Sequence, residues 1–362
     1  MEYRNLGKTN LKLSRLGFGC MRLPALKNGK TDEEKAVKIL REGYEKGINY
    51  FDTGDIYMGH TSEQTVAKAI EPFRKNVYLS TKTHSNFIFN GFKTHFEERL
   101  KIFGYVDVYH IWHASLADFK KIEKEGKTFD FLYRQKKEGN IKFIALSFHD
   151  EEPDNVKYIL DYGILDSILF SYNLLNYKMH EKWIEYAHKK GIGTIAMNPV
   201  GGGVLADLPA ETREKYPDVP KNNTALALKY VFNNPCLDVA ISGMGSGETV
   251  DFNTKIASSD YSLTQEDLNL ISKLREEKGE YLKLFCTGCK YCFECPKEID
   301  IPFIFKLYNQ ALIYNVYEKN KEIYKGVKFR GGDCISCKAC EKACPQHLKI
   351  ARALHEIEEY FK

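Results

Sequence analysis

The sequence lacks any apolar run close to the roughly 18 residues that would cross a bilayer. Its opening, MEYRNLGKTN, also lacks the apolar core of a signal peptide. The sequence also lacks a large excess of either sign of charge, because it has 53 basic and 49 acidic residues and the net charge of +4 is spread along the chain. These absences exclude the electrostatic footprint of a nucleic-acid-binding or membrane-binding protein and predict a cytoplasmic location.

Cysteine is the residue that does not fit such a location. Disulfides are a poor explanation for ten cysteines in a reducing compartment. Cys20 and Cys236 stand alone, whereas the other eight all fall between Cys286 and Cys344. The remaining composition, with 43% hydrophobic and 28% charged residues, is typical of a soluble packed protein and excludes a disordered or fibrous chain.

Short β-rich runs alternate with amphipathic helical stretches between about residues 16 and 244. The runs cover residues 15–20, 49–54, 77–83, 106–112, 142–148, 167–173, 193–198 and 237–243. The helical stretches include residues 32–46, 62–73, 118–138, 152–162, 178–190 and 224–233. This alternation predicts an α/β fold of the (β/α)₈ TIM barrel type. A doubly wound sheet is the competing fold, but no GxGxxG turn follows the first run.

Two helices carry capping signals at their starts. Thr31 precedes the stretch 32–46 and has Glu34 three residues later, which is the pattern of a capping box. Thr264 caps a last helix, after which the alternation stops and the cysteines begin. We therefore expect a barrel domain over residues 1–280 and a second domain over residues 281–362.

The eight clustered cysteines form two runs. One is Cys286-x₂-Cys289-x₂-Cys292-x₂-Cys295-Pro296, and the other is Cys334-x₂-Cys337-x₂-Cys340-x₃-Cys344-Pro345. The second has the spacing of a bacterial ferredoxin, in which three cysteines hold one cluster and the fourth holds the other. Two such runs predict two 4Fe–4S clusters with crossed ligation. Cys286, Cys289, Cys292 and Cys344 would hold one, and Cys334, Cys337, Cys340 and Cys295 the other.

Structural zinc is the alternative for these cysteines, since CxxC pairs also suit a tetrahedral zinc site. A zinc site does not explain, however, the third cysteine at the next x₂ interval or the Cys-Pro pair that ends each run. The connection between the runs, residues 296–333, includes the apolar stretch IPFIFKLYNQALIYNVYEKN. It is longer than in a compact βαββαβ ferredoxin, and the second domain resembles the α-helical ferredoxin type.

Polar residues at the ends of two barrel strands suggest chemistry. Asp52 lies near the end of the second run and Tyr57 follows in its loop, while Lys82 lies near the end of the third. A buried lysine beside a tyrosine lowers the pKa of the phenol, so that the tyrosine can donate a proton near neutral pH. An aspartate paired with the lysine keeps it charged despite burial. A purely structural Asp–Lys pair with a packed tyrosine is the alternative.

The chain from residue 1 to about 257 is similar to the aldo-keto reductase family. The matching segments are YRNLGKTNLKLSRLGFG, FDTGDIYMG, STKT, VDVYHIWH, IALSFH, YNLLN, MNPVGGG and ISGMGSGETVDFN. CTGCKYCFECP and CISCKACEKACPQ resemble the branch of that family with a C-terminal ferredoxin-like domain holding two 4Fe–4S clusters. The resemblance implies that Asp52, Tyr57 and Lys82 belong to a catalytic tetrad in which Tyr57 is the general acid.

The fourth tetrad member would be a histidine at the position of Trp112. His110 lies on the same strand face by the period of two, and His113 follows on the opposite face unless the strand has ended. Both are candidate replacements, and each could equally be a packed or surface histidine.

The resemblance also implies a cofactor site. Ser147 would hydrogen-bond a nicotinamide, Asn253 would lie on the adenine side, and Tyr172, Gly243 and Ser246 are further candidate contacts. The basic residues that clasp a 2′-phosphate are absent at Gly243 and Thr249, which gives NADP(H) little support and leaves NAD(H) open. Backbone N–H groups of Gly201, Gly202 and Gly203 could admit a phosphate, although a plain tight turn explains them equally well.

Three functions compete. In the first, the barrel oxidises or reduces a small organic substrate, such as a carbonyl or alcohol, and the clusters pass the electrons singly. Nicotinamide moves two electrons at once, so a flavin could bridge the two modes. In the second, the chain is an electron-transfer protein that docks a redox partner and its barrel is catalytically altered. In the third, it is an NAD-dependent reductase with purely structural clusters.

Overall fold

The structure is a computed structural model that describes residues 1–84, 87, 91–150, 152–206, 223–278, 284, 286–293, 295–314, 316–344 and 346–362. Within these ranges, no helix is both long enough and apolar enough to span a bilayer.

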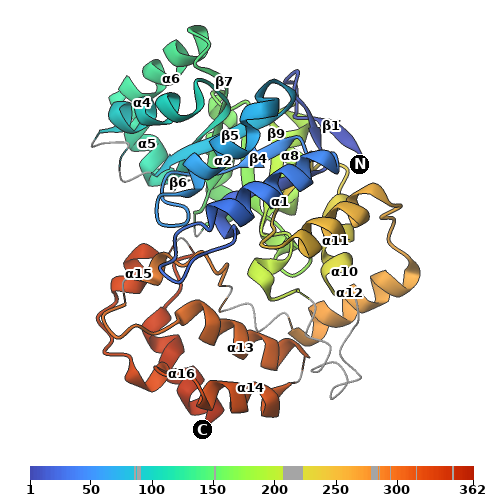
Figure 1. Ribbon diagram of the computed structural model, residues 1–362, viewed down its shortest axis with the longest axis vertical. Helices are drawn as coiled ribbons and strands as arrows, with labels where there is room; N and C mark the ends of the chain where they lie inside the picture. Colours follow the sequence, from blue (N-terminus) through green and yellow to red (C-terminus); the bar gives the residue numbers. More distant parts are fainter. Residues whose placement is uncertain are drawn as a thin grey trace. The chain divides into compact units, whose positions relative to one another are not determined.

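The parallel strands of the chain close into a barrel (Figure 1). The order of the eight strands around it is β10-β3-β4-β5-β6-β7-β8-β9. They are β3 (Leu16–Gly19), β4 (Tyr50–Asp52), β5 (Tyr78–His84), β6 (Val106–Ala114), β7 (Ile141–Phe148), β8 (Ser167–Ser171), β9 (Gly193–Met197) and β10 (Val239–Gly243). Each lies within or close to one of the predicted runs. The predicted (β/α)₈ barrel is therefore confirmed, and the doubly wound sheet is excluded.

Helices follow the strands in the chain. They are α1 (Glu33–Glu45), α2 (Ser62–Ile70), α4 (Phe92–Phe103), α5 (Leu116–Glu125), α6 (Lys127–Lys137), α7 (Val156–Tyr162), α8 (Tyr177–Lys189), α10 (Asn223–Phe232) and α11 (Gly247–Ser258). Short 3₁₀ turns are η1 (Cys20–Arg22), η2 (Glu71–Asn76), η3 (Pro153–Asn155) and η4 (Gly201–Gly203).

Two local predictions about these helices were wrong. The cap of α1 is Asp32 rather than Thr31, because the Asp32 carboxylate accepts the N–H of Lys35. The single helix predicted over 118–138 is broken into α5 and α6 at Gly126, whose φ of 67° ends the first helix.

A hairpin of β1 (Tyr3–Asn5) and β2 (Lys12–Ser14) precedes the barrel. Leu6, Leu11 and Leu13 pack into one cluster with Tyr50 and other inward-facing strand residues. This apolar plug fills the N-terminal end of the barrel, so a site for chemistry is left at the C-terminal ends of the strands.

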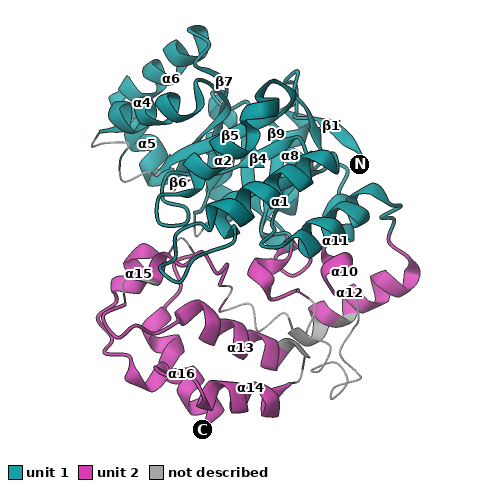
Figure 2. Ribbon diagram, viewed as in Figure 1, with its two compact units in different colours: residues 1–172, 177–199, 228–262 teal, residues 173–176, 200–227, 263–362 magenta. Residues whose placement is uncertain are grey.

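The chain forms two compact units (Figure 2). Unit 1 comprises residues 1–172, 177–199 and 228–262, and unit 2 comprises residues 173–176, 200–227 and 263–362. The loop after β9 thus belongs with the C-terminal residues. The division expected between residues 280 and 281 falls in the segment 279–283, outside the described residues, and stays a prediction.

The C-terminal part of unit 2 is helical. It contains α12 (Gln265–Lys278), α13 (Ile301–Tyr314), α14 (Tyr317–Lys325), α15 (Ala339–Ala343) and α16 (Ile350–Phe361), with turns η6 (Tyr291–Phe293) and η7 (Gly331–Asp333). The predicted cap Thr264 is confirmed, since its Oγ1 accepts the N–H of Asp267 at 3.1 Å. No strand occurs among the described residues beyond 263, as the α-helical ferredoxin type predicts. Its core holds Ile304, Phe305, Leu354 and Ile357.

Candidate functional site

Asp52 and Lys82 form a buried ion pair at the C-terminal end of the barrel. Asp52 pairs in register with Ser80, and Lys82 lies two residues beyond on the same inward face. The Nζ of Lys82 lies 2.8 Å from Oδ1 and 2.7 Å from Oδ2 of Asp52. The Ser80 hydroxyl donates a further bond of 2.7 Å to Oδ1. Both carboxylate oxygens are therefore satisfied although the pair is sealed from water.

Tyr57 lies against this pair. It is buried in the loop after β4, and the Nζ of Lys82 lies 5.1 Å from the centre of its ring. A Cβ at Gly54 would lie 3.0 Å from Cγ of Lys82 and 3.3 Å from Cζ of Tyr57, so the loop needs glycine there to approach the lysine. The structure thus brings the three predicted residues together; their catalytic roles stay a prediction.

Trp112 stands where the resemblance expects a histidine. It is buried on β6, in register with Ser147 of β7. Its ring meets that of Tyr57 edge to face, with centroids 5.6 Å apart and planes at 83°. The indole of Trp112 therefore packs against Tyr57 and presents an apolar surface to it.

His110 lies one step deeper, in register with Lys82. It is fully buried, and neither ring nitrogen makes a well-formed hydrogen bond within the described residues. Burial, and after it the Lys82 ammonium, push the pKa of His110 well below its ordinary value. His110 is therefore a neutral imidazole. His113 is part of β6, but its side chain lies outside what the structure describes.

A second buried polar cluster, which sequence reasoning missed, lies behind the loop of Tyr57. Nε of Arg99 on α4 lies 2.9 Å from Oε2 of Glu63 on α2, and Thr81 donates a 2.5 Å bond to the other oxygen. Asp55 is buried nearby, and neither of its oxygens is well hydrogen-bonded among the described residues. Burial, opposed by Arg99 and reinforced by Glu63, raises the pKa of Asp55 to about 6. The signal was a charged residue on the apolar face of each of two helices.

Of the predicted nicotinamide contacts, one faces inward and one does not. Ser147 shares the inward face with Trp112, and its Oγ lies 2.9 Å from Nε2 of His149. Tyr172 follows β8 on the opposite side, where its hydroxyl donates to Glu181 at 2.9 Å and meets the hydroxyl of Tyr230 at 3.1 Å. The structure therefore places Tyr172 among the helices, away from the ion pair.

The predicted adenine-side residues gather where β10 leads into α11. Ser246 caps α11 by accepting the N–H of Thr249 at 3.2 Å, and Asn253 donates to Ser242 at 3.2 Å. A Cβ at Gly247 would lie 2.9 Å from Oε2 of Glu42 on α1. An acidic side chain, which sequence reasoning missed, thus stands at the N-terminus of α11.

Gly243 and the Gly201–Gly203 turn both lie in close packing. A Cβ at Gly243 would lie 3.1 Å from Cδ of Arg22, so a basic side chain reaches this position from another loop. Gly202 has a φ of 69°, and a Cβ there would lie 2.7 Å from Cα of Thr287 and 2.8 Å from the carbonyl oxygen of Cys286. The turn after β9 is therefore a close backbone contact with the first cysteine run. Phosphate binding by this turn stays a prediction.

The two cysteine runs fold into matching loops. The N–H of Gly288 donates to Sγ of Cys286 and that of Ser336 to Sγ of Cys334, each at 3.4 Å. Positive φ angles recur at equivalent places, which are Gly288 and Ser336, Lys290 and Lys338, and Glu298 and His347. Sequence reasoning noted the runs but not this internal repeat, which the lysine after the second cysteine of each run signals. The runs differ in length by one residue, because two residues separate the last two cysteines of the first run and three separate those of the second.

The sulfurs gather crosswise between the runs. Burial, followed by the sulfurs of Cys289, Cys286 and Cys344, raises the pKa of Cys292 well above its usual value. Burial and then Cys334, Glu341 and Cys295 raise the pKa of Cys340 to about 11. Each last cysteine therefore neighbours the opposite run, the arrangement that crossed ligation requires.

This donor set fits iron–sulfur clusters better than zinc. Partly buried thiolates that face one another repel, so only bound cations can hold them ionised. Three cysteines at x₂ intervals with a further cysteine before a proline offer one thiolate to each iron of a cubane, whereas a single zinc ion takes all four thiolates on one centre.

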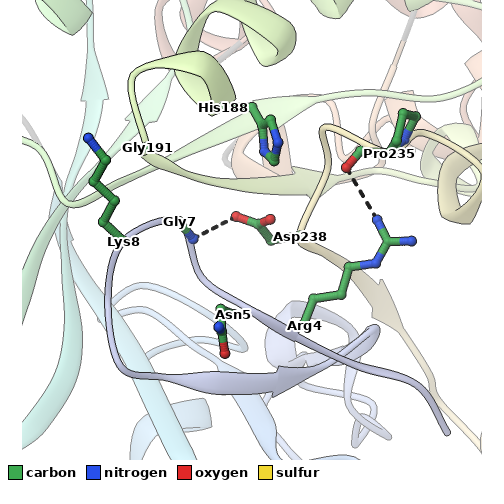
Figure 3. A pocket seen from close by; sticks show the side chains of 8 residues that line it. All are labelled: Arg4, Asn5, Gly7, Lys8, His188, Gly191, Pro235 and Asp238. Atoms are coloured by element: carbon green, nitrogen blue, oxygen red, sulfur yellow. Dashed lines mark hydrogen bonds between the residues drawn. The ribbon is translucent and has the colours of Figure 1, made fainter.

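A pocket at the other end of the barrel does not compete with this site (Figure 3). Its lining residues, such as Gly7, Gly191 and Asp238, precede strands or connect them at their N-terminal ends. Asp238 accepts the N–H of Gly7 at 2.9 Å, and Arg4 reaches the carbonyl of Pro235. These polar groups hold the hairpin to the barrel, which is a stabilising role.

Comparisons with known proteins agree with both halves of the chain. The model of the aldo/keto reductase family matches residues 15–276, and that of a 4Fe–4S dicluster domain matches residues 285–349. L-galactose dehydrogenase of Arabidopsis thaliana is 29% identical over 308 residues, which cover 76% of this chain and 95% of that protein. The uncharacterised oxidoreductase YqkF of Bacillus subtilis is 26% identical over 310 residues, which cover 75% and 95%.

Solved structures show the same barrel. The holo form of an aldo-keto reductase from Bacillus halodurans is 26% identical, with a TM-score of 0.63 and coverage of 76% of this chain and 96% of that one. An enzyme of Klebsiella pneumoniae, solved with NADP and acetate, is 18% identical with a TM-score of 0.60 over 76% and 96%, which shows the fold alone. The chain therefore belongs to the aldo/keto reductase family, as an oxidoreductase barrel followed by a 4Fe–4S dicluster domain.

Proposed function

We propose that the protein interconverts a small carbonyl compound and its alcohol at the barrel mouth and exchanges the electrons singly through two 4Fe–4S clusters. Reducing a carbonyl to an alcohol takes two electrons and two protons, and two clusters can hold one electron each. The supporting observation is the contact of Gly202 with Cys286 and Thr287, because the turn that carries Gly202 directly follows β9. We also propose residues 1–280 and 281–362 as the domains that perform the two tasks.

Tyr57 is the proton donor in this proposal. As its hydroxyl gives a proton to the substrate oxygen, the ammonium of Lys82 stabilises the phenolate that forms. Asp52 keeps Lys82 charged, since both its oxygens lie within 2.8 Å of Nζ. Tyr57→Phe should lower NADH oxidation driven by a panel of aldehydes and ketones by about 10²–10⁴-fold. Tyr158→Phe, at an exposed tyrosine on α7, should leave the rate unchanged.

NAD(H) is the nicotinamide cofactor that the residues at α11 favour, and when bound it would supply or accept a hydride. Glu42 at the helix N-terminus suits ribose hydroxyls and repels a 2′-phosphate. The binding of NADP by the Klebsiella pneumoniae enzyme therefore does not extend to this chain in the proposal. Titration by nucleotide fluorescence should show tighter binding of NADH than of NADPH. Glu42→Gln should lower the ratio of the NADPH dissociation constant to the NADH dissociation constant by about fivefold, which is the effect of removing about 1 kcal/mol of charge repulsion.

The eight cysteines hold the clusters in the crossed sets given above. Iron analysis of the anaerobically purified protein should find about eight irons per chain. The double variant Cys286→Ser/Cys344→Ser separates the two ligation patterns. If both cysteines serve one cluster, the variant keeps about four irons; if they serve different clusters, it loses both.

Coupling between the two halves is tested by electron paramagnetic resonance. Clusters reduced with dithionite and then freed of reductant should be reoxidised when an aldehyde is added together with NAD, and more slowly in Tyr57→Phe. Flavin in the purified protein would make flavin the bridge between hydride and single electrons. Full occupancy by NADH without flavin would instead count against the flavin bridge, and the single-electron coupling would then lack a converter, because nicotinamide moves two electrons at once.

One observation favours a second candidate, an electron-transfer or docking protein with an altered barrel. Trp112 stands at the tetrad histidine position, and His110 is sealed below it without a well-formed hydrogen bond in the described chain. That candidate predicts clusters that take up and release electrons while no carbonyl or alcohol in the panel changes their state.

A further inference from the structure

The two cysteine runs place their second cysteines in different surroundings. Cys289 is half-buried, whereas its counterpart Cys337 is exposed. Residues 335–339, which we call the exposed cysteine loop, are all open to solvent. Of residues 287–291, which we call the covered cysteine loop, Lys290 alone is exposed. Because positive φ angles recur at equivalent places in both loops, the difference lies in what packs around them.

An apolar cavity surrounds the sulfurs of the covered cysteine loop. Its lining includes the four cysteines of one crossed set, which are Cys286, Cys289, Cys292 and Cys344. Ile301 and Phe305 of α13 and Ile350 of α16 line it too, and each is at most 2% exposed. The backbone of Gly202 lies so close that a Cβ there would be 2.8 Å from the carbonyl oxygen of Cys286. A hydrophobic shell of this kind limits the access of water and dissolved oxidants to a metal centre.

The other crossed set, by contrast, is open on one side. Cys340 is buried in the helical core, whereas Cys337 lies on the exposed cysteine loop. The apolar side chain in this loop, Ile335, is 56% exposed, so most of its surface faces water and gives Cys337 little cover. The open side of this set is therefore at the iron assigned to Cys337.

We propose that Cys337 holds the exchangeable iron of the chain and that dioxygen removes this iron before any other. The inference rests on the clusters of the proposed function, but on none of its carbonyl chemistry. Each iron of a cubane is tied to the chain by one thiolate, so access at a single cysteine selects a single iron. Exposure also governs which cysteines are oxidised in proteins.

The step moves one electron and one iron. Dioxygen takes the electron and becomes superoxide. The 4Fe–4S core of charge 2+ then releases Fe²⁺ from Cys337 to solvent and becomes a 3Fe–4S core of charge 1+. The thiolate of Cys337, now without metal, takes a proton from water. One electron from a reductant together with Fe²⁺ reverses the change, so this cluster responds to the oxygen supply.

The test adds measured amounts of dioxygen to the anaerobically purified full chain. Electron paramagnetic resonance reports the 3Fe–4S core, and a coloured ferrous chelator reports the released iron. The first iron per chain should leave at least about tenfold faster than the next, with one 3Fe–4S signal per chain. Fe²⁺ and a thiol reductant, added without oxygen, should remove that signal. Release of two irons per chain at one common rate would overturn the inference.

Two single-cluster variants identify the iron that leaves first. Cys286→Ser/Cys344→Ser keeps the set of Cys337 and should retain the rapid phase. Cys334→Ser/Cys295→Ser keeps the covered set and should lose it. Each variant must hold about four irons before oxygen is added, which shows that the remaining cluster is intact. A rapid phase that follows the covered set instead would place the exchangeable iron elsewhere and overturn the inference.

A matched pair of apolar truncations tests the role of the cover. Leu348 lines the apolar cavity, so Leu348→Ala should speed release of the second iron toward the rate of the first. Ile335→Ala, at the exposed apolar side chain, should leave both rates unchanged. Equal release rates in the wild type and Leu348→Ala, with about eight irons in each beforehand, would show that the cavity does not protect its cluster.

The inference and the proposed function fail in different ways. Far fewer than about eight irons in the anaerobic wild type would refute the cluster assignment on which both rest. Rapid loss of one iron from a chain that turns over no carbonyl would leave the inference standing and refute the proposed coupling.

Discussion

Lys82→Met isolates the energetic role of the buried ion pair. The substitution keeps the length of the side chain but removes both contacts to Asp52, at 2.8 and 2.7 Å. Among the described contacts, the carboxylate keeps only the Ser80 hydroxyl at 2.7 Å. Leaving one partner of a buried pair uncompensated costs about 3–5 kcal/mol. For a barrel of this size, that loss corresponds to a fall in Tm on the order of 10 °C.

Tryptophan fluorescence measures this transition separately from the clusters. The chain has two tryptophans, Trp112 and Trp183, and both lie in unit 1. Thermal melts followed by their emission therefore report on the barrel. Lys189→Met is the matched control, since Lys189 pairs with Glu185 on the exposed surface of α8. Exposed pairs of this kind are screened by solvent and contribute little, so its Tm should move by no more than about 2 °C.

The double variant Asp52→Leu/Lys82→Met completes the reasoning. With both charges replaced by apolar groups, no unpaired charge is left, and most of the stability lost in Lys82→Met should return. A Tm for Lys82→Met equal to that of Lys189→Met would refute the buried ion pair. A double variant less stable than either single one would show that the charges are not coupled.

Three further predictions follow from buried groups near the two sites. The wild-type barrel should lose stability as pH rises from about 4 to 6, and Asp55→Asn should remove this loss. Thermal melts at several pH values measure both. The folded state raises the pKa of Asp55 from 3.8 to about 6, so it binds the proton more tightly than the unfolded chain, and ionisation costs about 3 kcal/mol. His110→Leu should leave Tm unchanged or raise it, because two buried ring nitrogens that make no well-formed hydrogen bond among the described residues disappear. A marked loss of carbonyl turnover would instead make His110 a participant in the reaction. Gly202→Ala should lower the iron content, or shift the electron paramagnetic resonance signal, of the cluster assigned to the first cysteine run, because the new Cβ would lie 2.7 Å from Cα of Thr287. The free energy of unfolding of the barrel should change by no more than about 1 kcal/mol.

The sequence was sufficient for features that depend on spacing. Alternation of strands and helices predicted the barrel, and the inward position of Asp52 and Lys82 follows from the period of two along neighbouring strands. Cysteine spacing predicted the dicluster domain in the same way. Each of these features repeats along the chain at a fixed interval, so a single sequence is enough to show it.

Contacts between distant segments could not be read from the sequence. The three glycines at 201–203 suggested a phosphate turn, yet Gly202 packs on Thr287 more than eighty residues away. Glu42 lies on α1, and only the fold brings it to the start of α11, some two hundred residues later in the chain. Tyr172 faces outward because the chain continues the alternation of β8 for one residue beyond its end. In each case the partner is set by how elements pack, which no local pattern encodes.

The surroundings of Tyr57 bear on two separate tasks of the proposed reaction, which are transfer of a proton and orientation of the carbonyl. Lys82 is ion-paired with Asp52, and its Nζ lies 5.1 Å from the centre of the Tyr57 ring. Trp112 cannot accept a proton, and the depressed pKa of His110 keeps that ring from carrying one at neutral pH. The residues of the proposed proton donor therefore lie together, while an indole edge stands where the resemblance expects a histidine. Tyr57→Phe consequently decides between the enzyme and the docking protein more directly than any histidine variant, because Tyr57 is the group through which the proposed reaction must pass.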